Sequence, residues 1–358
     1  MEYKQLGKTD VLVSTIGQGT MGIGGYFTKD STRDDFYIEM MRSGIEYGMT
    51  LIDTAEVYGA GHSEEVVGQA VKDYRKGIFI ATKVSPEHLA YDSVLKSAEG
   101  SLQRLQTDYI DLYQIHWPNP TIPLAETLQA MEKLVKDGKV RYIGVANFSL
   151  TQLKTANEIF SKEGIAVIQV EYNLFDRTAE EDILPYCEQK GLSMIAYSPL
   201  DQGRVLSNRD KIKVMQGIAK KYNKTVAQVT LKWLVSKPPV IAIPKATTIK
   251  HIRENASATV FDLNEEDIEL INMTFISPFV SIFPGRVRVG RDGLDKFIPN
   301  PEELAKDIQN GETLKPIRVV KSKDTSGKYD YDLVEGKVRY WAWVVAHNGK
   351  VPIWALVR

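Results

Sequence analysis

Polar and ionisable residues recur at the ends of short apolar segments through most of this 358-residue chain. The segments are rich in β-branched residues, and longer stretches with helical periodicity lie between them, which is typical of alternating strands and helices. The interior of a barrel strand is apolar, whereas catalytic side chains project from its carboxyl end. Their shared position in the repeat predicts one site that combines carboxylate, ammonium, imidazole, phenol, amide and hydroxyl groups, from Asp53, Lys83, His116, Asn147, Gln169, Tyr172, Asn173, Tyr197, Ser198 and Lys245.

The elements that must position these groups alternate regularly between strand and helix. Strands are predicted over residues 13–18, 50–54, 78–84, 110–116, 142–147, 167–172, 194–198 and 240–245, and helices over 34–46, 93–105, 124–136, 149–160, 180–189 and 209–222. Ser149 and Gln152 have the spacing of a capping box at a helix start. Roughly eight such units in about 250 residues match a closed (β/α)8, or TIM, barrel, so the predicted class is α/β.

An open, doubly wound sheet is the rival architecture. It would normally show a Gly-x-Gly-x-x-Gly turn after its first strand. The early glycines at positions 17, 19, 22, 24 and 25 do not have that spacing. Residues 4–10 predict instead a hairpin turn that covers the floor of a barrel.

The bulk composition excludes several classes of protein. A hydrophobic content of 43% and a charged content of 25% are ordinary for a globular chain. No apolar run approaches the roughly 18 residues that a membrane span needs, and the first residues lack the pattern of a signal peptide. The single cysteine, Cys187, excludes an internal disulfide and fits a reducing compartment. We therefore expect a cytoplasmic protein without membrane association, and we assign no metal site.

Five segments resemble the motifs of the aldo-keto reductase family, in the family's order and spacing. They are residues 51–59 (LIDTAEVYG), 81–84 (ATKV), 111–118 (DLYQIHWP), 139–145 (KVRYIGV) and 243–245 (IPK). The resemblance covers residues 1–275, which we take as the first domain. It implies a TIM barrel that reduces aldehydes or ketones to alcohols with a nicotinamide cofactor.

The resemblance also implies a catalytic tetrad, formed by Asp53, Tyr58, Lys83 and His116. The chemistry of these residue types agrees, because hydride transfer to a carbonyl leaves an oxyanion that must be protonated. Tyr58 is the expected general acid, and a nearby Lys83 ammonium would lower its pKa from about 10. Asp53 can act as the counter-ion that a buried lysine needs. His116 can donate a hydrogen bond to the carbonyl oxygen.

Cofactor and substrate positions carry over in the same way. Matches to cofactor-binding positions are Asn147, Gln169, Tyr197, Lys245, Thr248, Glu254 and Asn255. Tyr197 is expected to stack on the nicotinamide, and Lys245 to neutralise the 2′-phosphate of NADP(H), which we expect as the preferred cofactor. NAD(H) remains an alternative, because Ala246 and His251 stand where the family has Ser and Arg. Trp117, Tyr26 and Phe27 are the candidate walls of a pocket for a carbonyl or alcohol substrate.

Residues 277–358 predict a second, small α+β domain after a linker at 277–278 and 284–285. Helices are predicted over 300–309 and 339–346, and strands over 316–321, 329–334 and 352–357. This segment resembles the ParB N-terminal and sulfiredoxin-like superfamily, on residues 314–320, 331–342 and 351–353. The resemblance implies a nucleotide-phosphate site at Gly336 and Arg339, where a helix N-terminus and a guanidinium can bind an anion. The segment carries 14 Lys and Arg against 10 Asp and Glu, which allows an anionic partner.

Three hypotheses about function stay open at this point. The first is an active reductase. The second is a regulator that senses the nicotinamide cofactor and binds nucleotide or DNA through its second domain. The third joins a small kinase or nucleotidase to the reductase. For residues 277–358 taken alone, a purely structural role is the simplest interpretation.

Overall fold

The computed structural model describes residues 1–160, 164–207, 211–275, 279–289, 300–309, 317–324 and 326–357. The chain divides into two compact units. The first comprises Met1–Pro118, Ile122–Leu174 and Ala179–Phe275, and the second comprises Asn119–Thr121, Phe175–Thr178 and Ile276–Arg358. The expected start of the second domain at residue 277, and the linker at 277–278, lie outside the described residues.

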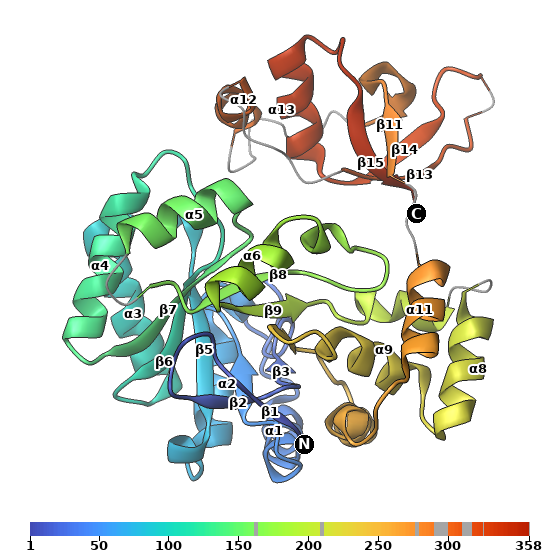
Figure 1. Ribbon diagram of the computed structural model, residues 1–358. Helices are drawn as coiled ribbons and strands as arrows, with labels where there is room; N and C mark the ends of the chain where they lie inside the picture. Colours follow the sequence, from blue (N-terminus) through green and yellow to red (C-terminus); the bar gives the residue numbers. More distant parts are fainter. Residues whose placement is uncertain are drawn as a thin grey trace. The chain divides into compact units, whose positions relative to one another are not determined.

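Eight parallel strands form the first unit's barrel (Figure 1). In sheet order from one end they are β3 (Gln18–Gly19), β4 (Leu51–Asp53), β5 (Phe79–Val84), β6 (Ile110–Ile115), β7 (Val140–Ala146), β8 (Val167–Glu171), β9 (Ser193–Tyr197) and β10 (Val240–Ala242). A parallel bridge between Ile16 and Ala242 joins the two ends of the sheet. The predicted α/β barrel is confirmed.

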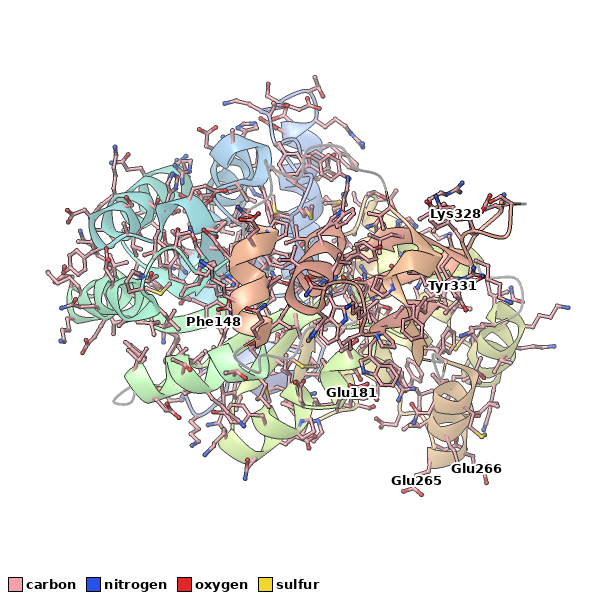
Figure 2. All side chains as sticks on the ribbon, turned by 90° about the horizontal axis from the view of Figure 1, so that it is seen from above. Phe148, Glu181, Glu265, Glu266, Lys328 and Tyr331 are labelled. Carbon is pink, nitrogen blue, oxygen red and sulfur yellow. The ribbon has the colours of Figure 1, made fainter. Side chains whose placement is uncertain are left out.

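Helices lie around this barrel (Figure 1). They are α1 (Asp34–Glu46), α2 (His62–Val71), α3 (Tyr91–Leu105), α4 (Leu124–Lys136), α5 (Leu150–Ile159), α6 (Ile183–Lys190), α7 (Arg204–Ser207), α8 (Ile212–Tyr222), α9 (Val226–Val235), α10 (Ile249–Ala256) and α11 (Glu265–Thr274). The capping box at Ser149 is present at the start of α5. At the start of α11, Asn264 accepts a hydrogen bond from the Asp267 backbone, and Glu265 and Glu266 point outward (Figure 2). Acidic side chains suit a helix N-terminus because they face the positive end of its dipole.

The predicted first strand, 13–18, is wrong as a single element. Residues Leu12–Ser14 form β2, which pairs antiparallel with β1 (Tyr3–Gln5) as the expected floor hairpin. Thr15 still belongs to this hairpin, because its backbone N–H and its hydroxyl both donate to the Glu2 carbonyl. The barrel begins at Ile16, and Val13 packs with Leu6 in the core instead of lining a barrel strand.

The described residues of the second unit form a mixed sheet with two helices. The sheet order is β11 (Phe279–Ile282), β15 (Ile353–Val357), β13 (Ile317–Lys321), β14 (Tyr331–Glu335) and β12 (Val287–Arg288). Helices α12 (Pro301–Gln309) and α13 (Lys337–His347) complete it. Its apolar core includes Ile317, Val319 and Ala355, all fully buried. This unit therefore has a core of its own.

One prediction for the second unit needs correction, and two of its strands were not predicted. Residues 284–285, expected in a linker, form part of a short 3-10 turn (Pro284–Arg286) between β11 and β12. Both flanking strands were missed because they are short, and only their partners β15 and β14 show that they join a sheet.

Within the described residues, no helix is long and apolar enough to cross a membrane, and no group of three metal-ligating side chains occurs.

Candidate active site

The carboxyl ends of the barrel strands bring the predicted site residues together. Asp53 ends β4, Lys83 lies near the end of β5, and Tyr197 ends β9. His116 and Asn147 follow β6 and β7 directly. Because all of these strands run parallel, their ends meet at one mouth of the barrel. This is the arrangement that the polar strand ends predicted.

A buried ion pair lies at the centre of the site. The Lys83 Nζ donates to Asp53 Oδ1 over 2.6 Å and to the Thr54 carbonyl over 2.8 Å. Both charged side chains are almost fully buried. Asp53 raises the pKa of Lys83 against the opposing effect of burial, so the lysine keeps its proton. The ammonium is thereby fixed in charge and in position.

Tyr58 lies beside this pair, on a tight turn (Tyr58–Gly61) between β4 and α2. Its ring centroid is 5.2 Å from Lys83 Nζ and 5.7 Å from the ring of His116. Gly59 makes the turn possible, because it has a φ of 58° and a Cβ there would lie 2.3 Å from the Gly24 carbonyl oxygen. The Gly59 N–H also donates to the Tyr26 carbonyl, which ties the loop bearing Tyr26 to this turn.

Lys83 lowers the pKa of Tyr58 as expected, but the net shift of that pKa is upward. Burial raises the pKa of the Tyr58 phenol, and the Lys83 charge only opposes part of that effect. A phenolate is costly in a site shielded from water. Tyr58 is therefore a protonated phenol at neutral pH.

His116 is neutral for a related reason. Burial lowers the pKa of its imidazole from 6.5 to about 3, and the positive charge of Lys83 adds to the effect. A neutral imidazole still carries one N–H donor. His116 and Tyr58 can thus both donate hydrogen bonds next to the Lys83 ammonium.

Amide groups form the next layer of the site. Tyr197 donates from its hydroxyl to Asn147 Oδ1 over 2.9 Å, and Asn147 Nδ2 donates to the His116 carbonyl over 3.0 Å. Asn147 has a φ of 62°, a left-handed conformation that asparagine tolerates better than most residues. Gln169 Nε2 donates to Asp53 Oδ2 over 2.8 Å. The amides predicted to hold a cofactor are therefore bonded to the predicted tetrad.

Gln114 is a site residue that our sequence reasoning missed. It is fully buried within β6, and its amide lies within 3.4 Å of both Asp53 Oδ2 and Gln169 Nε2. A glutamine inside a predicted barrel strand, before its polar end at His116, was the available signal.

The loop after β10 and helix α10 carry the remaining cofactor positions. The Lys245 side chain is exposed, with its Nζ 5.4 Å from the ring centroid of Tyr26. The Thr248 side chain caps α10 by accepting from the His251 backbone N–H. Glu254 and Asn255 both lie on α10; Glu254 is half-buried and Asn255 is buried. The loop and the helix thus provide a lysine, Lys245, and the capped N-terminus of α10.

The candidate substrate walls are exposed aromatic side chains. Trp117, Tyr26 and Phe27 have 48%, 58% and 77% of their surface accessible. Exposed rings of this size in a protein with an apolar core are available to contact a ligand. Their contact with a substrate stays a prediction.

In the second unit, Gly336 and Arg339 lie at the start of α13, as predicted. Gly336 has a φ of 92°, and Arg339 Nη2 lies 3.4 Å from Glu335 Oε1. The guanidinium therefore already faces a carboxylate. An anion site at these residues stays a prediction.

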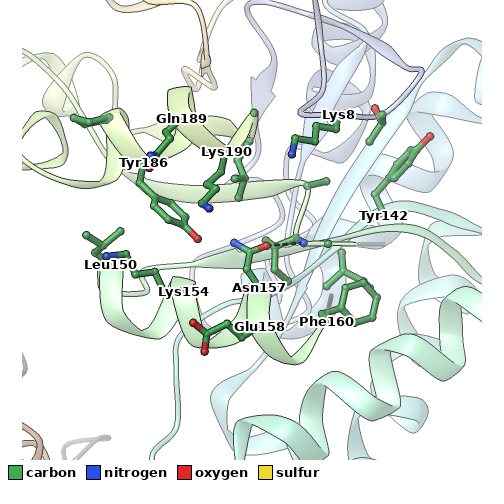
Figure 3. A pocket seen from close by; sticks show the side chains of 18 of the residues that line it. Lys8, Tyr142, Leu150, Lys154, Asn157, Glu158, Phe160, Tyr186, Gln189 and Lys190 are labelled. Carbon is green, nitrogen blue, oxygen red and sulfur yellow. Dashed lines mark hydrogen bonds between the residues drawn. The ribbon is translucent and has the colours of Figure 1, made fainter. Parts of the chain in front are cut away.

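A groove of about 1370 Å³ lies elsewhere on the first unit (Figure 3). It is lined by the hairpin residues 8–10 and by α5 and α6, and it contains none of the predicted site residues. Lys8 and Lys190 point into it, as does the Tyr186 ring (Figure 3). Its lining holds equal numbers of basic and acidic side chains, namely Lys8, Arg141, Lys154 and Lys190 against Asp10, Glu158, Glu181 and Asp182. Its electrostatics therefore favour neither sign of ligand.

Comparison with known proteins gives matches over the first unit. The model of the aldo/keto reductase family matches residues 15–274. Methylglyoxal reductase YeaE of Escherichia coli is 38% identical over 270 residues, covering 75% of this chain and 93% of that protein. Glyoxal reductase of Bacillus subtilis is 38% identical over 269 residues, covering 74% of this chain and 87% of that protein.

Two crystal structures show the same fold. The thermostable aldo-keto reductase Tm1743, solved with the inhibitor epalrestat, is 47% identical with a TM-score of 0.74, and the match covers 76% of this chain and all of that one. An aldo/keto reductase from Klebsiella pneumoniae, solved with NADP and acetate, is 38% identical with a TM-score of 0.71. That match covers 77% of this chain and 96% of the other.

Proposed function

This chain belongs to the aldo/keto reductase family, and on that premise we propose that it reduces aldehydes or ketones to alcohols with NADP(H), using Tyr58 as general acid. One observation carries the assignment of the acid: the Tyr58 phenol lies beside the Lys83 ammonium, which is paired with the buried Asp53 carboxylate. Such a pair can supply a proton and stabilise the anion that remains.

Each residue of the site has a distinct part in this proposal. His116 and Tyr58 donate hydrogen bonds to the carbonyl oxygen and orient the substrate. Tyr58 then transfers its hydroxyl proton to that oxygen as negative charge develops there, and the nearby Lys83 ammonium stabilises the resulting phenolate. Asp53 keeps Lys83 charged and in place. In the oxidative direction, the Tyr58 phenolate accepts the proton of the alcohol.

The residues present fit a nicotinamide cofactor. When bound, the cofactor supplies the hydride that reduces the carbonyl carbon. Asn147 and Gln169 offer amide groups at the barrel mouth, and the Tyr197 ring lies beside Asn147. Lys245 and the start of α10 offer a cation and a helix N-terminus for phosphate. Two crystal structures of aldo-keto reductases from Klebsiella pneumoniae, one with NADP and one with NADPH, support NADP(H) as the preferred cofactor.

The names of two relatives and the exposed aromatic side chains support a proposal for the substrate class. Two relatives are named as reductases of methylglyoxal and glyoxal, which are small α-dicarbonyl compounds. We therefore propose small aldehydes and dicarbonyls, placed against Trp117 and Tyr26, as the first substrates to test.

The test is the oxidation of NADPH by the full-length protein against aldehydes, ketones and dicarbonyls, with NADH in parallel. Tyr58→Phe should nearly abolish turnover and leave the cofactor dissociation constant close to normal. Tyr113→Phe is the matched control, because the Tyr113 hydroxyl is buried and has no hydrogen-bond partner in the described part of the chain. A Tyr58→Phe variant that turns over normally would refute the proposed acid.

The regulator hypothesis makes a different prediction for the same experiment. It expects tight NADPH binding without turnover of any carbonyl, and binding of ATP, CTP or duplex DNA that is lost in Arg339→Ala. Binding to DNA should weaken steeply with added salt. The Lys83–Asp53 ion pair beside Tyr58 favours the reductase.

A further inference from the structure

The strand β6 contains one polar side chain that points into the site without belonging to the tetrad. Gln114 pairs in register with Lys83 on β5 and with Gly144 on β7. Gly144 makes room for it, because a Cβ at that position would lie 3.0 Å from Gln114 Cγ. Burying an amide costs free energy unless its polar atoms are bonded, so the partners of Gln114 show what it does.

Both ends of the Gln114 amide are engaged. Its Nε2 donates to Asp53 Oδ2 over 3.4 Å, and its Oε1 accepts from Gln169 Nε2 over 3.4 Å. Gln169 Nε2 also donates to Asp53 Oδ2 over 2.8 Å. The two glutamines and the aspartate therefore form a closed ring of three hydrogen bonds, and all three side chains are at least 97% buried.

This ring determines which way the Gln169 amide faces. An amide nitrogen has two hydrogens, and here Asp53 and Gln114 accept both of them. Among the described residues none donates to Gln169 Oε1, which leaves that oxygen to accept from a ligand. The carboxamide NH2 of a nicotinamide is a donor of the required kind. If the Gln169 amide were flipped, its oxygen would face the Asp53 carboxylate and repel it.

We propose that Gln114 is a positioning residue that locks the Gln169 amide toward the cofactor carboxamide and, through Asp53, holds Lys83 beside Tyr58. The inference rests on the proposed function. It links the orientation of the nicotinamide to the charge that stabilises the phenolate, through a residue that touches neither. The hydrogen bonds to Asp53 Oδ2 leave Oδ1 to Lys83, so the carboxylate cannot rotate away from the lysine.

The first test is Gln114→Met, which keeps the side-chain volume and removes the amide. We expect kcat to fall about threefold to tenfold, as for the loss of one weak hydrogen bond to a charged group. The dissociation constant of NADPH, measured by quenching of tryptophan fluorescence, should rise by a similar factor. A double-mutant cycle with Gln169→Met should be non-additive in that dissociation constant, because both variants break the same ring.

The second test is Gln114→Glu, which separates positioning from packing. A protonated carboxylic acid can still donate to Asp53 and accept from Gln169, whereas an ionised one repels Asp53. Activity relative to wild type should therefore be close to normal at low pH and fall as pH rises through the elevated pKa of the introduced acid. A role in packing alone would not make the defect depend on pH.

Gln18→Met is the matched control. Gln18 is also a buried glutamine of the barrel, but its Nε2 donates to the carbonyls of Met41 and Met49. The Gln18→Met substitution should lower the stability of the protein and leave the pH profile of kcat and the affinity for NADPH unchanged. The positioning role would be overturned if the wild type is active and both Gln114 variants keep the NADPH affinity and the pH profile of the wild type. An inactive wild type would instead count against the proposed function.

Discussion

At the scale of single residues, burial has more influence on the protonation of the site than neighbouring charges have. It raises the pKa of Tyr58 above 10 although Lys83 opposes it, and it lowers the pKa of His116 to about 3. Burial opposes the charge of Lys83, but Asp53 and Tyr58 together raise the pKa of the lysine, so it keeps its proton. The site therefore combines two neutral donors with one fixed cation.

These directions predict the pH dependence of carbonyl reduction. Reduction needs the protonated phenol, which exists below the pKa of Tyr58, so kcat should decline only as pH rises beyond about 10. His116 should produce no acid limb near pH 6.5, because it stays neutral down to about 3. A profile of kcat against pH checks both statements, and an alkaline limb close to neutrality would contradict the raised pKa of Tyr58.

Lys245 provides the prediction on cofactor choice. Its exposed ammonium is expected to pair with the 2′-phosphate that only NADPH carries. Lys245→Ala should weaken NADPH by about tenfold or more and leave NADH nearly unchanged, since a charge-assisted hydrogen bond is lost for one cofactor alone. Titration with both cofactors measures this, and Lys220→Ala on α8 serves as the control for removing an exposed lysine. Equal losses for the two cofactors would remove the basis for preferring NADP(H).

At the scale of elements, helix ends place the loops that carry the site. The Ser149 hydroxyl accepts from the Gln152 backbone N–H over 3.2 Å, and Gln152 Oε1 accepts from the Ser149 N–H over 2.9 Å. This cap begins α5 two residues after Asn147, so it holds the end of β7 where the site needs it.

Ser149→Ala should therefore destabilise the first unit by about 1 kcal/mol, the usual cost of losing an N-cap. Urea denaturation measures the change. Thr151→Ala, on the exposed face of the same turn, should show no comparable loss. If the two variants were equally stable, the cap would contribute nothing to folding.

At the scale of the whole molecule, each unit has an apolar core made from its own strands. Leu51, Leu112 and Ile195 belong to the core of the first unit, whereas Ile317 and Val319 belong to that of the second. Separate cores are the condition for separate unfolding transitions.

Ile317→Ala should accordingly destabilise the second unit by about 2–5 kcal/mol, because it leaves a cavity at a fully buried position. Differential scanning calorimetry of the full chain should show one transition moving to lower temperature while the other keeps its midpoint. A single transition that shifts as a whole would mean that the two units unfold together.

Local sequence patterns determined much of this protein. The alternation of β-branched and amphipathic segments predicts the barrel, and the polar strand ends predict the residues at its mouth, because parallel strands necessarily bring their carboxyl ends together. The Ser149 cap was also readable, since a capping box depends on two residues three positions apart. Helix α9 was not predicted, because it is buried on nearly every face and so lacks an amphipathic period.

Tertiary structure alone decided the properties that depend on what surrounds a residue. The division of residues 13–18 between hairpin and barrel follows from the bond of Thr15 to Glu2, and the sequence around Thr15 does not contain that partner. The motifs that carry Lys83 and Tyr58 predict an attraction between the ammonium and the phenolate, which lowers the pKa of Tyr58. The larger effect on that pKa is the removal of water from the phenol, which raises it. Likewise, Gln114 acquires its role only when β4, β6 and β8 bring Asp53, Gln114 and Gln169 into one ring of hydrogen bonds. Solvation and long-range hydrogen bonding depend on the packed barrel as a whole, whereas local patterns depend on neighbours along the chain.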